Sequence, residues 1–203
     1  MATAKTKVAA KKTGAKAAAT KPAKAAAAKP AKAPAKPAAK TGKTDKASKL
    51  AVGDVAPAFA LPDDEGKSVS LSSFAGKKIV VLYFYPKDDT PGCTRESCDF
   101  QSGLGAFAKK GAVILGVSRD GTASHQKFKK KYGLAFPLLT DADRKVHDAY
   151  GAWGMKTMYG KKVEGVIRTT VVIDRVGKLA AVFPGVKVDG HADKVLAAVD
   201  AAK

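Results

Sequence analysis

The composition of the chain changes abruptly near residue 50, and this change confines the folded part to the residues that follow. Residues 1–49 contain fourteen Lys, one acidic residue and no aromatic side chain, and Ala, Pro and Thr supply most of the remainder. Such a segment cannot bury enough apolar surface to offset the conformational entropy lost on ordering. We therefore expect residues 1–49 to form a disordered, low-complexity tail and residues 50–203 to form one folded domain.

Most of the positive charge lies in this tail. The whole chain has a formal net charge of +19, and fourteen Lys against one Asp give the tail +13, while twenty-three basic and seventeen acidic residues give residues 50–203 only +6. Interspersed Lys residues bind phosphate backbones by releasing counterions, but without aromatic residues they do not stack on bases. A nonspecific, salt-sensitive nucleic-acid contact, with association to the nucleoid, and a purely solubilising role both remain open for residues 1–49.

Membrane attachment and export are not indicated. No stretch approaches the roughly 18 to 20 consecutive apolar residues of a membrane span, and the N-terminus lacks the apolar core of a secretory signal. A transit peptide is typically rich in Arg, and the tail contains none. We expect a cytoplasmic protein, in which two Cys leave metal, redox and core roles open.

The pattern of apolar residues after the tail predicts an α/β fold. The continuous apolar run at 79–84 is typical of a central strand covered on both faces. We expect strands at 52–60, 68–71, 79–84, 112–117, 136–139, 169–174 and 179–183, and helices at 93–110, 122–132, 142–150 and 190–202. A mixed central sheet flanked by helices and closed by a C-terminal hairpin and helix is the arrangement of a thioredoxin-like fold.

Cys93 lies at the start of the first predicted helix. Thr90 is a favourable N-cap and Pro91 fits the first helical position, which places Cys93 in the first turn. Unpaired backbone N–H groups and the helix dipole favour negative charge there, and therefore the thiolate. From these residues alone, an ordinary loop with a capping Thr and a small apolar Cys is the alternative.

The same segment resembles a known family. Pro86, Thr90 and Cys93 match the Pro-x-x-x-Thr-x-x-Cys motif of peroxiredoxins, and residues 84–100 resemble the bacterioferritin comigratory protein or peroxiredoxin Q subfamily nearly residue for residue. The subfamily pattern has a second Cys five residues later, and Cys98 occupies that position. The resemblance covers about residues 50–203 and none of the tail, and it is also carried by residues 150–154, 159–160 and 165–170.

The resemblance implies a thiol-dependent peroxidase that reduces hydrogen peroxide and organic hydroperoxides. Cys93 would be the peroxidatic nucleophile that becomes a sulfenic acid, and Cys98 would resolve it to an intramolecular disulfide that a thioredoxin-like dithiol reduces. Thr90 would hydrogen-bond the thiolate and the peroxide, Arg168 would place a positive charge beside the sulfur, and Pro86 would shield the site from water. No cofactor or metal is implied, and we expect a monomer.

The spacing of the two Cys has a structural consequence of its own. On one α-helix, Cα atoms five residues apart are separated by roughly 8 to 9 Å and point about 140° apart. A disulfide needs Cα atoms within about 7 Å of each other. We therefore expect the helix to unwind locally after Cys93 is oxidised, and the reduced protein to hold the sulfurs of Cys93 and Cys98 apart.

Metal binding finds little support in the sequence. His125, His147 and His191 have no metal-ligand spacing to one another or to the Cys pair, and we expect them at the surface. A zinc site at Cys93 and Cys98 lacks two further ligands. Thioredoxin-type exchange usually uses Cys-x-x-Cys, whereas four residues intervene here.

Four further charged residues have ordinary structural interpretations. Asp88 and Asp89 are expected as loop residues, because a loop between a strand and a helix commonly contains Asp. Glu96 is expected to be a favourable partner of the helix dipole in the first turn. Without the resemblance, Arg168 would be assigned to the surface at the end of a strand.

Overall fold

The strand Ile79–Phe84 (β3) forms the middle of the sheet, as its continuous apolar run predicted. The coordinates are a computed structural model that describes residues 50–158 and 161–202. All six residues of β3 are buried. It pairs in parallel with Ala112–Ser118 (β4) and antiparallel with Thr169–Ile173 (β8). The predicted tail at residues 1–49 lies outside the described residues.

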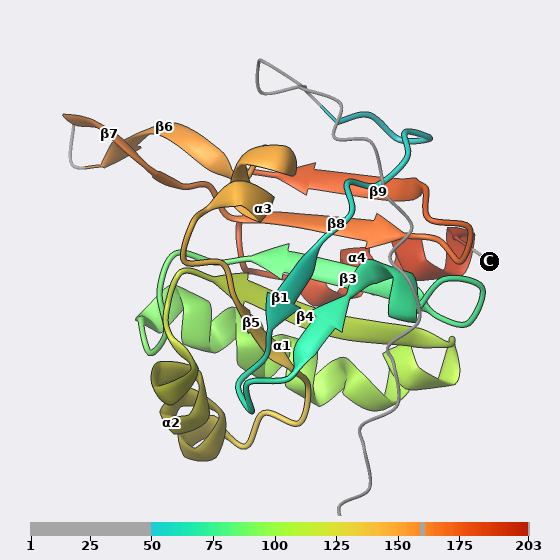
Figure 1. Ribbon diagram of the computed structural model, residues 1–203, viewed down its shortest axis with the longest axis horizontal. Helices are drawn as coiled ribbons and strands as arrows, with labels where there is room; N and C mark the ends of the chain where they lie inside the picture. Colours follow the sequence, from blue (N-terminus) through green and yellow to red (C-terminus); the bar gives the residue numbers. More distant parts are fainter. Residues whose placement is uncertain (1–49, 159–160, 203) are drawn as a thin grey trace, which may run out of the picture. The chain divides into compact units, whose positions relative to one another are not determined.

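The central sheet is mixed and five-stranded, with the order β5-β4-β3-β8-β9. Leu138–Thr140 (β5) pairs in parallel with β4, and Leu179–Pro184 (β9) pairs antiparallel with β8 (Figure 1). This order and the flanking helices confirm the thioredoxin-like α/β fold expected from the sequence.

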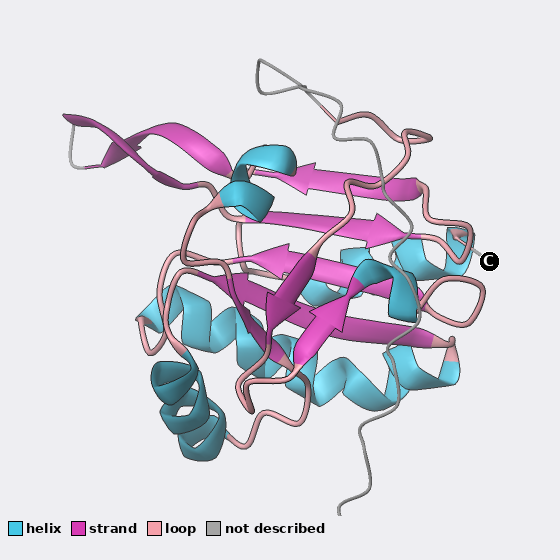
Figure 2. Ribbon diagram, in the orientation of Figure 1, coloured by secondary structure: helices cyan, strands magenta, loops and turns pink. Residues whose placement is uncertain are grey.

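Both faces of the sheet are covered. Pro91–Lys109 (α1), His191–Ala201 (α4) and Thr122–Tyr132 (α2) contribute to the apolar cluster that contains Tyr83 and Cys93. Figure 2 shows α1 and α4 together on one side of the sheet. Because alternate side chains of β3 point to opposite faces, its other residues join a second cluster on the far side of the sheet, and this cluster also contains Val146 of the short helix Lys145–Ala149 (α3) and residues of the opening segment.

The opening hairpin begins later than predicted. Ala60–Pro62 (β1) pairs with Ser68–Ser70 (β2), followed by a 3-10 turn at Leu71–Ser73 (η1). The predicted strand at 52–60 is wrong over most of its length, because the chain turns at Gly53, which has a left-handed φ of 96°. Only Val55 makes a bridge in that segment before β1.

A second hairpin was not predicted. Trp153–Met158 (β6) and Lys161–Val166 (β7) pair antiparallel and project from the body of the domain (Figure 1). Because little of this hairpin is buried, its sequence lacks the apolar alternation that marks a strand. Trp153 anchors its base, since the guanidinium carbons of Arg119 and Arg144 lie 5.2 and 5.0 Å from the centre of the indole ring.

The other predicted elements are present, with shifted ends in several cases. The helix predicted at 122–132 matches α2 at both ends. Those predicted at 142–150 and 190–202 are shorter in the structure, and the strand predicted at 136–139 begins two residues later. No helix within residues 50–158 and 161–202 is long and apolar enough to cross a membrane.

Candidate active site

Cys93 is the third residue of α1 and only 1% exposed. The helix begins as predicted, with Thr90 as the N-cap residue in extended backbone conformation and Pro91 in the first turn. The Thr90 side chain accepts no capping hydrogen bond, and its hydroxyl donates to the Lys87 carbonyl oxygen at 3.1 Å. The sulfur therefore lies at the positive end of the helix, against the core.

Arg168 contacts the sulfur of Cys93. Its Nη2 lies 3.3 Å from Cys93 Sγ, and its Nη1 makes an ion pair with Glu96 Oε2. A Cβ atom at Gly92 would lie 3.4 Å from the same Nη2, which is ordinary van der Waals contact. The interpretation of Arg168 as a surface residue is wrong, and the position implied by the resemblance agrees with this geometry.

The backbone fixes Arg168 on both sides. It follows β7 and immediately precedes β8. The amide of Ile167 donates to the carbonyl of Ala152 at 2.8 Å, and the amide of Val186 donates to the carbonyl of Arg168 at 2.9 Å. The guanidinium is therefore placed by the hairpin and the central sheet together, from a segment far from Cys93 in sequence.

Glu96 does not act as the first-turn dipole partner that the sequence suggested. The first turn contains no acidic residue, and Glu96 is 1% exposed against Arg168. Burial raises the pKa of Glu96 to about 7, although the positive charge of Arg168 opposes this rise. Its Oε1 has no hydrogen-bond partner within the described residues. The three-residue spacing from Cys93 on one helix could have revealed that both face the same way.

Cys98 lies on the same uninterrupted helix and is half-buried. Burial, followed by the negative charge of Asp99, raises the pKa of its thiol. Both cysteines are free thiols in this structure. Because α1 is continuous from Pro91 to Lys109, a disulfide between Cys93 and Cys98 requires the helix to change conformation.

The loop between β3 and α1 is braced by a buried polar network. The Asp88 carboxylate accepts hydrogen bonds from the Tyr85 hydroxyl and the Ser124 hydroxyl, each at 2.7 Å. His125 Nδ1 donates to the same carboxylate at 2.9 Å. Burial raises the pKa of Asp88, but these hydrogen bonds outweigh it and hold the pKa below its usual range. The loop that carries Pro86 and Thr90 is thus fixed to α2.

This network was not predicted from the sequence. Asp88 is 6% exposed, so its interpretation as an ordinary loop residue was incomplete, whereas Asp89 does lie on the surface and pairs with Lys131. The surface assignment of His125 is wrong, because its side chain is fully buried. The position of His125 three residues before Phe128, on the apolar face of α2, could have indicated that it is buried.

The other two histidines are also buried, contrary to expectation. His147 Nδ1 donates to Asp141 at 2.7 Å. His191 Nε2 lies 2.8 Å from the Thr170 hydroxyl oxygen, and its ring packs edge-on between Phe100 and Phe183. Each buried imidazole has a hydrogen-bond partner and an aromatic contact, which reduce the cost of burying a polar ring.

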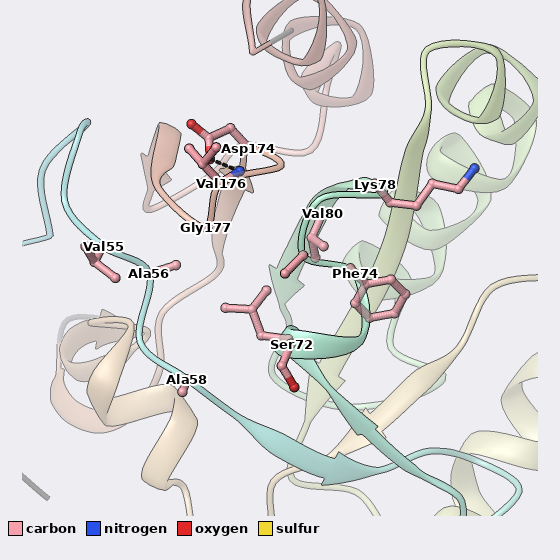
Figure 3. Close-up of a pocket in the computed structure, with 12 residues that line it drawn as sticks. Val55, Ala56, Ala58, Ser72, Phe74, Lys78, Val80, Asp174, Val176 and Gly177 are labelled. Atoms are coloured by element: carbon pink, nitrogen blue, oxygen red, sulfur yellow. Dashed lines mark hydrogen bonds between the residues drawn. The ribbon is translucent and has the colours of Figure 1, made fainter. Parts of the chain in front are cut away.

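Two further observations concern metal binding and the position of a pocket. Within the described part of the chain, no group of three or more His, Cys, Asp or Glu side chains could hold a metal ion. A pocket of about 220 Å³ lined by Val55, Val80 and Val176, among others, is formed at the start of β3 (Figure 3). None of the predicted site residues lines it, and Cys93 follows the opposite end of that strand.

Comparisons with known proteins agree with the fold and with the family that the sequence resembles. The model of the AhpC/TSA family matches residues 52–182. Peroxiredoxin Bcp of Bacillus subtilis is 45% identical over 147 residues, which are 72% of this chain and 93% of that protein. Peroxiredoxin Bcp of Escherichia coli is 41% identical over 147 residues, covering 72% and 94% of the two chains.

A solved structure is similar over the same region. The bacterioferritin comigratory protein of Xanthomonas campestris superposes with a TM-score of 0.67 at 46% sequence identity. The match covers 71% of this chain and 92% of that one. The described domain and its motif therefore have relatives with known structures, whereas the matched family region begins only after the tail.

Proposed function

The chain belongs to the AhpC/TSA family of peroxiredoxins, and from this premise we propose that Cys93 is the residue with which it attacks peroxide. The family membership makes it a thiol-dependent peroxidase, which acts on a hydroperoxide and is recycled by a thiol reductant. The observation that carries the assignment of Cys93 is the contact of its sulfur with Arg168 at 3.3 Å, in the first turn of α1.

In the first step, the Cys93 thiolate attacks one peroxide oxygen and the O–O bond breaks. The sulfur is oxidised to a sulfenic acid, and the other oxygen leaves with a proton as water or an alcohol. The guanidinium of Arg168 supports this step because it is a fixed positive charge with several N–H donors beside the sulfur. Glu96 holds the guanidinium there through the ion pair.

Thr90 and Pro86 complete the proposed site. The Thr90 hydroxyl donates to Lys87 when no peroxide is bound, and we expect it to turn toward the thiolate and the substrate oxygen. Pro86 is half-buried in the loop before α1, a position from which its ring can exclude water from the sulfur. The buried Asp88 network supports both roles because it restrains the loop.

In the second step, the Cys98 sulfur attacks the sulfenic sulfur of Cys93. A disulfide forms between Cys93 and Cys98 and water leaves, so that both sulfurs are now oxidised. A thioredoxin-like dithiol then reduces this disulfide by exchange. We expect hydrogen peroxide and alkyl hydroperoxides as substrates, and the Xanthomonas campestris relative is described as having alkyl peroxide reduction activity.

The proposed cycle is tested by following peroxide consumption with thioredoxin, thioredoxin reductase and NADPH. Cys93→Ser should abolish turnover, because no other described residue offers a thiol at a helix start beside an Arg. Cys98→Ser should strongly reduce it. Turnover that survives Cys93→Ser would contradict the assignment of the nucleophile, and full turnover by Cys98→Ser would contradict the role of the second Cys.

The basic tail motivates a second, separate proposal. Residues 1–49 carry a net charge of +13 without an aromatic residue, a composition that favours contact with the phosphate backbone of nucleic acid over base recognition. We expect the tail to hold the peroxidase on nucleic acid in a salt-sensitive manner. Such contact would associate the protein with the nucleoid, and from the family resemblance we expect a cytoplasmic monomer.

A further inference from the structure

The proposed disulfide requires four residues to leave the helix. Thr94, Arg95, Glu96 and Ser97 separate the two cysteines, and their helical path keeps the Cα atoms of the cysteines roughly 8 to 9 Å apart. The contacts of these four residues therefore oppose resolution. Two of them are almost completely buried, Glu96 at 1% and Ser97 at 0% exposed. The inference below rests on the proposed two-cysteine cycle.

The Ser97 side chain is hydrogen-bonded to the central strand β3. Its Oγ lies 3.0 Å from the Tyr83 hydroxyl, and both side chains are fully buried. Tyr83 does not move with the unwinding segment, because it lies in β3 between β4 and β8 and its ring packs against Tyr85 at 5.4 Å between ring centroids. The hydrogen bond thus joins the part of α1 that must unwind to the central strand β3, which stays in place.

The neighbouring strand provides room for this contact. Gly116 on β4 is the direct partner of Tyr83 in the sheet. A Cβ atom at Gly116 would lie 2.8 Å from the Tyr83 hydroxyl oxygen and 2.7 Å from Leu138, closer than atoms can approach. The absence of a side chain at Gly116 therefore allows the phenol group to reach Ser97.

The two anchors of the segment differ in their response to oxidation. Arg168 contacts both Glu96 and Cys93, so its interaction with α1 depends on the charge of the sulfur and weakens when the thiolate becomes a neutral sulfenic acid. The bond between Tyr83 and Ser97 joins two neutral groups in a dry core, and oxidation of Cys93 does not alter it. It remains intact until the helix itself opens.

We propose that the Tyr83–Ser97 hydrogen bond is a latch that sets how quickly α1 unwinds after Cys93 is oxidised. Two reactions then compete for the sulfenic acid. It condenses with the Cys98 thiol to a disulfide with loss of water, or a second peroxide oxidises it to a sulfinic acid and is itself reduced to water or an alcohol. A tight latch favours over-oxidation, and a loose one favours the disulfide.

The test compares wild type with Ser97→Ala, Tyr83→Phe and the double variant. Each protein is reduced, mixed with one equivalent or an excess of hydrogen peroxide, and quenched at intervals with an alkylating reagent. Mass spectrometry then measures the disulfide and sulfinic forms. Each single variant should form the disulfide about fivefold faster, the effect of losing one buried neutral hydrogen bond. The sulfinic fraction at excess peroxide should fall accordingly.

The double variant should resemble either single variant, because all three remove the same bond. Ala is also a better helix former than Ser, so faster unwinding of Ser97→Ala cannot be assigned to lower helix propensity. Unchanged disulfide rates in both single variants would overturn the latch, and so would effects of the two substitutions that simply multiply in the double variant.

Tyr150→Phe is the matched control. It removes a buried tyrosine hydroxyl that donates to the Pro57 carbonyl oxygen at 2.6 Å, in the cluster on the other face of the sheet. Its disulfide rate should equal that of wild type, even though the free energy of unfolding falls. If Tyr150→Phe formed the disulfide as fast as the latch variants, general destabilisation of the fold would be enough to explain their faster disulfide formation. That result would overturn the latch. Failure of wild type to form the Cys93–Cys98 disulfide would instead contradict the two-cysteine cycle itself.

Discussion

Arg168 contacts two acidic groups at the site, the Cys93 sulfur and the Glu96 carboxylate. Its planar guanidinium reaches both with separate nitrogens, which a single ammonium group cannot do in the same way. Burial of Glu96 against Arg168 excludes water from one side of this arrangement. The surroundings of the Cys93 sulfur are therefore formed by side chains that lie three and seventy-five residues away in the sequence.

Replacement of Arg168 should slow the reaction of Cys93 with peroxide. Arg168→Met removes the positive charge and should lower the second-order rate constant by about 10- to 100-fold, the range for one charge-assisted contact. Arg168→Lys should retain part of the rate, because it keeps the charge but not the paired nitrogens. Stopped-flow measurement of Cys93 oxidation checks this.

Arg175→Met is the control for that series, since Arg175 is exposed in the turn between β8 and β9. Its rate constant should equal that of wild type. An Arg168→Met protein that reacts as fast as wild type would show that the guanidinium does not assist the thiolate.

At the level of elements, His191 links α4 to the sheet. It begins α4, lies 2.8 Å from the Thr170 hydroxyl oxygen on β8, and packs against Phe100 of α1. Burial, together with the positive charges of Lys194 and Arg168, lowers the pKa of His191 to about 4. The imidazole is therefore neutral in the folded protein at pH values where it is already protonated in the unfolded chain.

This shift predicts a stability that decreases in acid. Because the folded pKa is depressed, the contribution of His191 is fully present above the unfolded pKa of about 6.5 and is lost as the pH falls toward 4. Urea unfolding of wild type and His191→Gln at several pH values checks this. The free-energy advantage of wild type should shrink between pH 6.5 and 4, on the order of 2 to 3 kcal/mol. A constant difference would contradict it.

The sequence predicted those elements whose apolar pattern is complete. The continuous apolar run at β3 is buried along its whole length, as its pattern indicates, and α2 begins and ends where it was predicted. The β6–β7 hairpin escaped prediction because most of its described side chains are exposed or half-buried and because its base is held by Trp153 between two Arg side chains. The partners of Asp88 and Glu96 come from α2 and from the segment before β8, and no local pattern reveals such contacts.

At the scale of the whole molecule, the charge is divided between two very different regions. Residues 50–203 carry +6, whereas residues 1–49 carry +13 in about a third of the length. The family match begins at residue 52, so the peroxidase site and the basic segment occupy separate parts of the sequence. Peroxidase activity and any contact with nucleic acid should therefore be separable by truncation.

Deletion of residues 1–48 should abolish retention of the protein on DNA at low salt and leave peroxide turnover unchanged. The reason is that the deleted Lys residues supply the counterion release, while every proposed site residue lies after residue 85. Gel-shift titrations over a range of salt concentrations, run beside the coupled peroxidase assay, check both parts. Equal retention before and after the deletion would exclude the tail as the binding element.

The most direct test of the central claim is to trap the sulfenic acid. Cys98→Ser protein is treated with one equivalent of hydrogen peroxide in the presence of dimedone, and the modified residue is identified by peptide mass spectrometry. The account predicts a stoichiometric adduct on Cys93, because the resolving thiol is absent and the sulfenic acid persists. Consumption of the peroxide without an adduct on Cys93 would contradict it.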